Sequence, residues 1–107
     1  MKKVMISQPM TGKSEEEILA VRKAATEYLE KLGYEVVNTW FRDEWDRIDK
    51  LPSVPFRHVH VHFLAMSLEA MAACDMVYFC KGWKDSRGCQ IEHETARLYG
   101  VDCIYEN

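Results

Sequence analysis

The sequence predicts an α/β domain in which helices cover both faces of a parallel sheet. Two observations support this prediction. Short apolar runs of strand length alternate along the chain with longer segments whose apolar residues recur at helical spacing. In addition, the 107 residues supply one hydrophobic core and leave no room for a second. Strands that alternate with helices pair in parallel through right-handed crossovers, so we expect a single domain over residues 1–107.

Four segments have the length and composition of β-strands. They are rich in β-branched and aromatic residues. The predicted strands are Val4–Ser7, Tyr34–Thr39, Met76–Cys80 and Asp102–Tyr105.

Three helices are expected between these strands. The first begins after Ser14, which forms a capping box with Glu17, and it stops at Gly33. The second is expected at 61–73 and the third at 86–99, before Gly100. Apolar residues recur at helical spacing in the first helix, at Ile18, Val21, Ala25, Tyr28, Leu29 and Leu32.

This succession predicts a flavodoxin-like three-layer sandwich with strand order 2-1-3-4. In that order the winding of the sheet reverses between the first and third strands, and open α/β sheets bind ligands in the crevice at such a point. The loops that border the crevice are residues 7–13 and 81–88. We therefore expect the functional site there.

Composition excludes several classes of partner. Fourteen Lys and Arg against seventeen Asp and Glu give a net charge of −3, the wrong sign for binding a nucleic-acid backbone. No apolar run approaches the about 20 residues that cross a bilayer, and the N-terminal apolar run breaks at Ser7. We expect a cytoplasmic protein without a membrane partner. Its four cysteines form no CxxC pair and are expected to be reduced thiols.

The segment 40–60 is the one long connection in the predicted fold. It carries aromatic residues and prolines among many charges. So long a loop in a compact domain is usually a lid or a contact surface.

Two motifs resemble known sites but lack a required part. Gly12, Lys13 and Ser14 match the end of a phosphate-binding P-loop, but Ser7 stands where that loop needs a glycine. His58 and His62 have the spacing of metal ligands on a helix, but no third ligand is evident. We predict neither a metal nor an organic cofactor.

Glu92 has an unexpected position in the third predicted helix. It falls within an arc of apolar and small residues, formed by Gly88, Cys89, Ile91, Thr95, Ala96, Leu98 and Tyr99. A buried ionised carboxylate without a partner costs several kcal/mol, so it must be paired, protonated or open to a pocket. A partly desolvated carboxylate in a cleft is a suitable nucleophile at a sugar carbon. The structural alternative is pairing with Lys81, Lys84 or an arginine.

Three stretches resemble the nucleoside 2-deoxyribosyltransferase-like family, in a compact branch whose members mostly have no assigned activity. They are ISQPMTGKSEEEI, LAMSLEAMAACDMVYF and GWKDSRGCQIEHETARLYG. The similarity covers nearly the whole chain apart from residues 40–60. In that family, a glutamate shortly after the glycine-containing turn attacks the anomeric carbon of a 2-deoxyribonucleoside. The deoxyribosyl group then passes to another base or to water. The resemblance implies that Glu92 is the catalytic nucleophile.

The resemblance implies further site residues, with departures from the family pattern. The family's aspartate on the second helix falls on Ser67, and a further acid falls on Ser86, whose neighbour Asp85 is the second catalytic candidate. Trp83 is expected either to stack on a base or to pack against a helix or subunit. The candidate substrate-binding residues are Ser7, Gln8, Thr11, Gly12, Ser67, Trp83, Ser86 and Gly88.

The expected function is cleavage or transfer at the N-glycosidic bond of a 2-deoxyribonucleoside or its 5′-monophosphate. Members of the family complete their crevice with a neighbouring subunit, so the resemblance implies a homodimer or larger assembly. Candidates for that contact are Trp40, Phe41, Trp45 and Phe56. Two alternatives stay open. One is a non-catalytic nucleotide-binding module, which Ser67 favours, and the other is an interaction protein that uses the aromatic segment 40–60.

Overall fold

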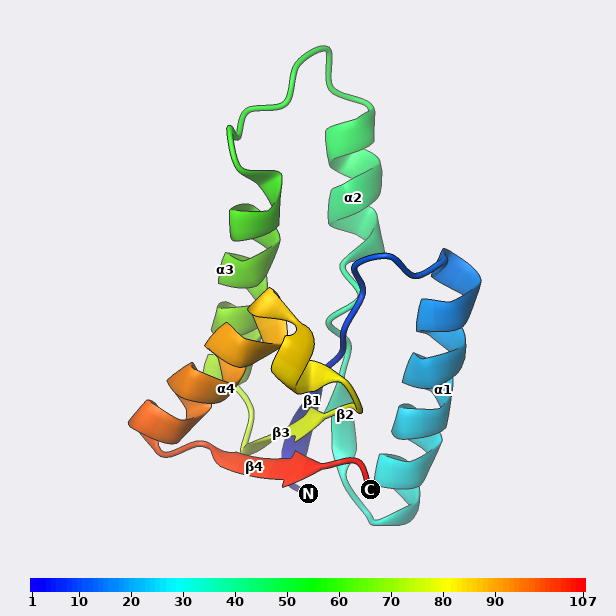
Figure 1. Ribbon diagram of the computed structural model, residues 1–107, viewed down its shortest axis with the longest axis vertical. Coiled ribbons are helices and arrows are strands. Elements are labelled where there is room, and N and C mark those ends of the chain that lie inside the picture. The colour runs from blue at the N-terminus through cyan, green and yellow to red at the C-terminus, as the bar shows by residue number, and fades with distance from the viewer.

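A computed structural model describes all residues, 1–107 (Figure 1). The elements follow one another in the order β1 (Lys3–Ser7), α1 (Glu15–Lys31), β2 (Glu35–Val37), α2 (Arg42–Asp49), α3 (Val59–Ala72), β3 (Met76–Phe79), the 3-10 helix η1 (Trp83–Asp85), α4 (Arg87–Tyr99) and β4 (Asp102–Tyr105).

The four strands form one parallel sheet in the order β2-β1-β3-β4. This confirms the predicted order and the flavodoxin-like α/β class. The last residue of β1, Ser7, lies beside Phe79, the last residue of β3. The carboxyl ends of these two central strands therefore meet at the same edge of the sheet, as the winding reversal between them requires.

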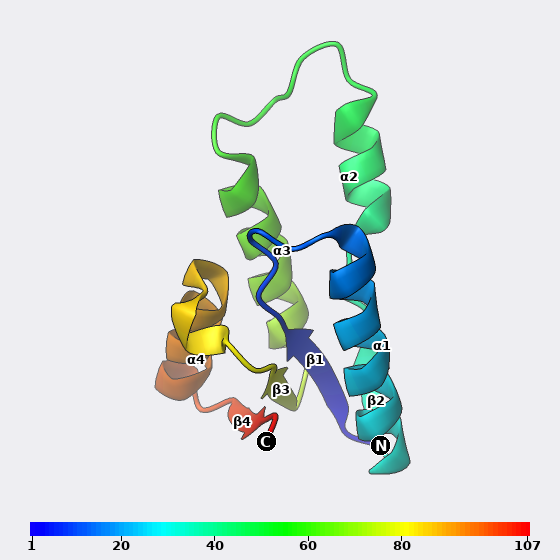
Figure 2. The same cartoon turned by 45° about the vertical axis from the view of Figure 1, so that its right-hand side comes forward.

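Helices cover the two faces of the sheet unequally (Figures 1 and 2). Helix α1 lies on one face, where Ala25 and Leu29 join a core with the inward side chains of β1 and β3. On the other face, Met71 of α3 and Ala96 of α4 pack against a second core. Right-handed crossovers produce this distribution, because the chain moves one way from β1 to β2 and the other way afterwards.

The segment 40–60, expected as one long loop that is a lid or a contact surface, contains a fourth helix, α2, at residues 42–49. The helix is short and mostly charged, so its apolar residues are too few to reveal a period. Local ion pairs stabilise it, between Arg42 and Asp46 and between Glu44 and Arg47. Ile48 is its only buried residue.

Helices α2 and α3 form a hairpin that projects beyond the sheet (Figures 1 and 2). The Trp45 ring of α2 stacks on the Phe63 ring of α3 at 4.0 Å between centroids. On α3, His62 stacks on Phe56 and also pairs with Glu44. No helix in the structure combines the length and the apolar character needed to cross a membrane.

The predicted apolar arc of α4 is rotated in the structure. The buried residues are Cys89, Glu92 and Ala96, whereas Leu98 is 63% exposed and Tyr99 is also exposed. The sequence wheel grouped Leu98 and Tyr99 with the core because it counts only hydrophobicity. Glu92 nevertheless lies on the buried face, as predicted.

Candidate functional site

Glu92 points from α4 toward the end of β1. The residue is 7% exposed, and its Oε1 accepts a 2.7 Å hydrogen bond from Ser7 Oγ. No lysine or arginine forms a salt bridge with it. The carboxylate is therefore buried at the carboxyl edge of the sheet and is held by a neutral hydroxyl.

Burial raises the pKa of Glu92 above that of an ordinary glutamate. Hydrogen bonds from Ser7 and Ser67, and then the positive charge of Arg22, oppose this rise. Ser67 belongs to α3 and Arg22 to α1, so two other helices and the end of β1 converge on one carboxylate. A group with a displaced pKa in such a convergence is a candidate functional residue.

Arg22 of α1 is a second buried charge, and the sequence reasoning missed it. It is 9% exposed, and Nε donates to Gln8 Oε1 at 3.1 Å while Nη1 donates to Thr39 Oγ1 at 3.1 Å. The sequence contains a pattern that identifies this residue. Arg22 lies between Ile18 and Ala25 on the inward face of α1, where a charge is as unusual as Glu92 is on α4.

Gln8 is buried directly after β1, and both ends of its amide are engaged. Nε2 donates to the Ile18 carbonyl at 2.6 Å, and Oε1 accepts from Arg22. The residue thus joins the β1–α1 loop to α1. Its expected contact with substrate stays a prediction.

Ser86 and Gly88 lie at the start of α4. Ser86 caps the helix, because its Oγ accepts from the backbone N–H of Cys89 at 3.4 Å. A side chain at Gly88 would meet no atom within 4 Å, so the space beside it is open. Residues four apart share one face of a helix, and this open space therefore adjoins Glu92.

Trp83 and Asp85 both belong to η1 but differ in their surroundings. Trp83 is half-buried, and its ring lies 4.2 Å from His93 and 5.7 Å from Tyr105 between centroids. Packing against α4 was one of the two roles expected for it. Asp85 is exposed, and its carboxylate makes no hydrogen bond within the chain.

Thr11 and Gly12 form an exposed turn that Lys13 closes by donating to the Met10 carbonyl at 3.1 Å. Gly12 has φ of 78°, a conformation that glycine adopts without strain. Ser14 then caps α1, with its Oγ accepting from the Glu17 amide at 3.1 Å. The capping function predicted for Ser14 is confirmed.

Two cavities of the structure lie away from Glu92. One, of about 530 Å³, lies between α1 and β3. The other, of about 260 Å³, is lined by Trp40, Trp45, Glu15, Arg42 and Asp46. No group of three His, Cys, Asp or Glu side chains comes together to hold a metal ion.

Residues 2–105 match a family described as a domain of unknown function (DUF4406). No curated protein and no solved structure matches the chain. Any assignment of activity consequently depends on the chemistry of the site itself.

Proposed function

The chain belongs to the DUF4406 family, and we propose that it cleaves or transfers the N-glycosidic bond of a 2-deoxyribonucleoside or its 5′-monophosphate. The observation that carries the proposal is Glu92, a carboxylate with 7% exposure and no cationic partner at the carboxyl edge of the two central strands. The resemblance to the nucleoside 2-deoxyribosyltransferase-like family supports the same residue independently.

In the proposed mechanism, Glu92 attacks the anomeric carbon and the C1′–N bond breaks. The electron pair of that bond leaves with the base, which takes a proton, and the sugar remains as an ester on the carboxylate. A second base or water then attacks the same carbon and releases Glu92. The Ser7 hydroxyl fixes the orientation of the carboxylate at 2.7 Å. Asp85, exposed on η1, is the proposed acid that protonates the leaving base.

The first experiment compares the protein with its Glu92→Gln variant on a panel of deoxynucleosides and their 5′-monophosphates. Free base is measured by chromatography. Loss of the nucleophile should lower kcat by about a thousandfold or more, while the amide preserves the shape of the site. The matched control is Glu94→Gln, because Glu94 is exposed on the same helix and pairs only with Arg97. Release of base that is equal in both variants would remove Glu92 from the mechanism.

A nucleotide-binding module without catalysis is the second candidate. Ser67 favours it, because the family's aspartate is replaced there by a hydroxyl that already bonds Glu92. Calorimetric titration of the same ligands distinguishes the two candidates. A binding module takes up ligand but releases no base, and Glu92→Gln changes its affinity little.

We further propose that two copies associate through α3. Helix α3 is apolar around most of its circumference, Glu69 is its one Asp, Glu, Lys or Arg, and only Met71 is buried. Val61 near its start is 62% exposed. Helices that are hydrophobic on all sides are normally buried. The aromatic residues expected at the subunit contact pack within the α2–α3 hairpin in part, since Phe41 and Trp45 both lie against Phe63.

A further inference from the structure

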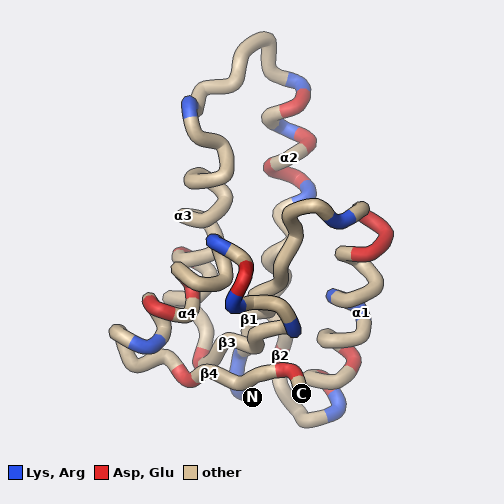
Figure 3. Tube along the Cα trace, viewed as in Figure 1, with Lys and Arg blue, Asp and Glu red and all other residues tan.

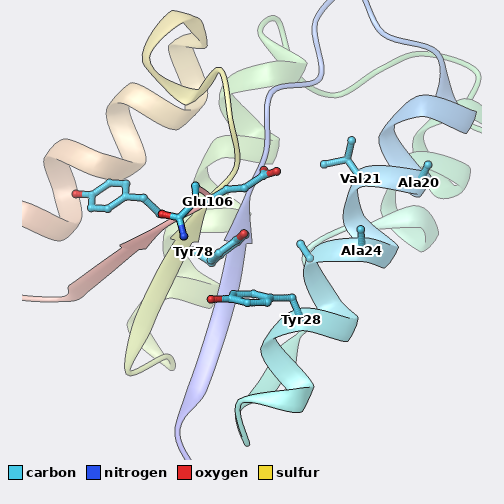
Figure 4. Close-up of a pocket in the computed structure, with 9 residues that line it drawn as sticks. Ala20, Val21, Ala24, Tyr28, Tyr78 and Glu106 are labelled. Atoms are coloured by element: carbon cyan, nitrogen blue, oxygen red, sulfur yellow. The ribbon is translucent and has the colours of Figure 1, made fainter.

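A groove of about 530 Å³ lies beside α1, over the half of the sheet that contains β3 and β4 (Figure 4). Val21, Ala24 and Tyr28 line it from the helix. From the other side it is lined by Tyr78 of β3 and by Tyr105 and Glu106 at the end of β4. Its volume is within the range of about 300–1,000 Å³ that small-molecule sites occupy.

The topology of the sheet produces this groove. Neighbouring strands are about 4.8 Å apart and a helix with its side chains is about 10 Å across, so one helix covers about two strands. Helix α1 is alone on its face, because α3 and α4 pack on the other one. The β3–β4 half of the α1 face therefore has no helix above it.

Tyr78 provides a polar group inside this groove. The residue is 5% exposed, and no hydrogen bond joins its hydroxyl to another group of the chain, so the hydroxyl oxygen is the part of the side chain that is accessible from the groove. Figure 4 shows the ring lying between α1 and the end of β4, with the hydroxyl toward the groove. Burial, followed by the charge of Glu106, raises the pKa of Tyr78 to about 12. The group is therefore a neutral phenol at physiological pH, with its oxygen free to accept a hydrogen bond.

Glu106 is the one charged side chain that lines the groove. The backbone N–H of Lys81 donates to its Oε1 at 3.0 Å and fixes its orientation. The other carboxylate oxygen has no partner within the chain. No lysine or arginine lines the groove, and its three aromatic rings are all tyrosines. Carboxylates and aromatic faces both attract cations.

From these features we propose that the groove is a second ligand site, for a small organic cation with an aromatic or hydrocarbon body. The ammonium group donates to Glu106 and to the Tyr78 oxygen, and the apolar body packs on Val21, Ala24 and Tyr28. The site is independent of Glu92, which comes from α4 on the opposite face of the sheet.

Saturation-transfer NMR with three matched probes tests the proposal. The probes are 2-phenylethylamine, 2-phenylethanol and 3-phenylpropanoate at pH 7, which differ chiefly in charge. We expect the amine to bind at least about fivefold more tightly than the alcohol, and the carboxylate to bind least. Backbone amide shifts should change along residues 20–28 of α1.

Two conservative variants then locate the cation. Glu106→Gln should reduce amine affinity about fivefold or more and leave the alcohol unchanged. Tyr78→Phe removes one hydroxyl, keeps the ring, and should weaken the amine by a smaller factor. Glu69→Gln on α3 is the control for net charge and should change nothing. Equal binding of amine and alcohol, no amine binding, or equal losses in Glu106→Gln and Glu69→Gln would each overturn the proposal.

Discussion

Two opposite charges are buried separately at the carboxyl edge of the sheet. Glu92 is bonded to Ser7, whereas Arg22 is bonded to Gln8 and Thr39. Each charge is hydrogen-bonded to neutral groups and not paired in a salt bridge, while the charge of Arg22 acts on Glu92 from a distance. Groups with displaced pKa values cluster at functional sites, and burial lowers the pKa of Arg22 and raises the pKa of Glu92. Their separation is the residue-scale support for a functional site at this edge.

Replacing Glu92 with Gln should stabilise the protein at neutral pH. Because burial raises the pKa of Glu92, the folded state holds its proton more tightly than the unfolded state does. The contribution of this group to stability is therefore complete below the unfolded pKa of about 4.3 and is lost as pH rises through the higher folded pKa. The uncharged variant avoids that loss, and we expect a gain of about 1 kcal/mol at pH 7.5.

Thermal unfolding at pH 7.5 and at pH 4 measures this gain, which should nearly vanish at the lower pH. Glu94→Gln is the control, since Glu94 is exposed on the same helix. A loss of stability in Glu92→Gln at neutral pH would show instead that the carboxylate has a structural role. In the proposed mechanism, the same raised pKa implies that turnover declines on the acid side at a higher pH than for an ordinary glutamate nucleophile.

Arg22→Met should destabilise the fold by about 2–3 kcal/mol. The substitution preserves the length of the side chain but leaves the buried Gln8 oxygen without its donor. Loss of the positive charge should also raise the pKa of Glu92 further and move the acid limb of the activity profile to higher pH. Urea unfolding measures the loss of stability. The control is Lys23→Met at an exposed neighbouring position, whose free energy of unfolding should stay within about 0.5 kcal/mol of that of the unmodified protein. Equal effects of the two substitutions would contradict the network described for Arg22.

The site was predictable from the sequence where a charge interrupts an apolar face. Glu92 was identified in this way, and Arg22 satisfies the same criterion on α1. The position of Ser67 beside Glu92 was not derivable from spacing, because it depends on how α3 packs against α4. The bonding of Gln8 to α1 depends equally on tertiary packing.

At the scale of elements, the strands and the three long helices were predictable because their periodic patterns are long or repeated. Helix α2 was not, because its eight residues contain only two large apolar side chains, Trp45 and Ile48. It is stabilised by charge pairs within the helix and by aromatic contacts with α3. Neither kind of interaction produces a hydrophobic period that a sequence pattern can reveal.

Trp45→Ala should loosen the α2–α3 hairpin without loosening the sheet. The substitution removes the ring that stacks on Phe63 at 4.0 Å, and aromatic pairs contribute about 0.5–1.5 kcal/mol beyond their buried area. The hairpin projects from the body of the protein, so it can open while the sheet stays folded (Figure 2). Hydrogen exchange should accelerate about tenfold over residues 42–63 and stay unchanged in β1 and β3.

Lys50→Ala is the control for this experiment, because Lys50 is exposed at the end of α2. Acceleration throughout the sheet would mean that the hairpin and the body unfold as one unit. Hydrogen exchange of the hairpin over a series of pH values is a second test. Hydrogen bonds from Arg47 and then His62 lower the pKa of Glu44 to about 2, so this group stabilises the hairpin in its ionised form. Its stabilising contribution is present above the unfolded pKa and is lost as pH falls toward 2.

At the scale of the whole molecule, the helices differ in how many charges they carry. Figure 3 shows charges of both signs along α2 and acidic residues at the start of α1, whereas α3 is almost free of charges. The exposed apolar residues Val61 on α3 and Leu98 on α4 lie on the two helices that share one face of the sheet. Exposed apolar side chains gathered into a patch mark an interaction site in soluble proteins, and Val61 is the most exposed apolar residue of α3.

Val61→Glu should therefore dissociate the proposed homodimer. A charge placed in an apolar interface loses hydration without gaining a partner, and its cost repeats in each copy of a twofold assembly. Sedimentation equilibrium should give the mass of two chains for the unmodified protein and of one chain for the variant. Lys23→Glu on α1 changes surface charge in the same direction and should stay dimeric. Leu98→Glu shows whether α4 shares the interface.

A monomeric mass for the unmodified protein at all concentrations would contradict association through α3. Measuring activity and mass together on dilution shows whether catalysis depends on the proposed dimer. If the second copy closes the crevice over Glu92, dilution below the dissociation constant should reduce specific activity together with mass. Activity that stays constant while the mass halves would place the whole catalytic site within one chain. Val61→Glu should then dissociate the assembly without altering turnover, because Val61 has no contact with the Glu92 carboxylate.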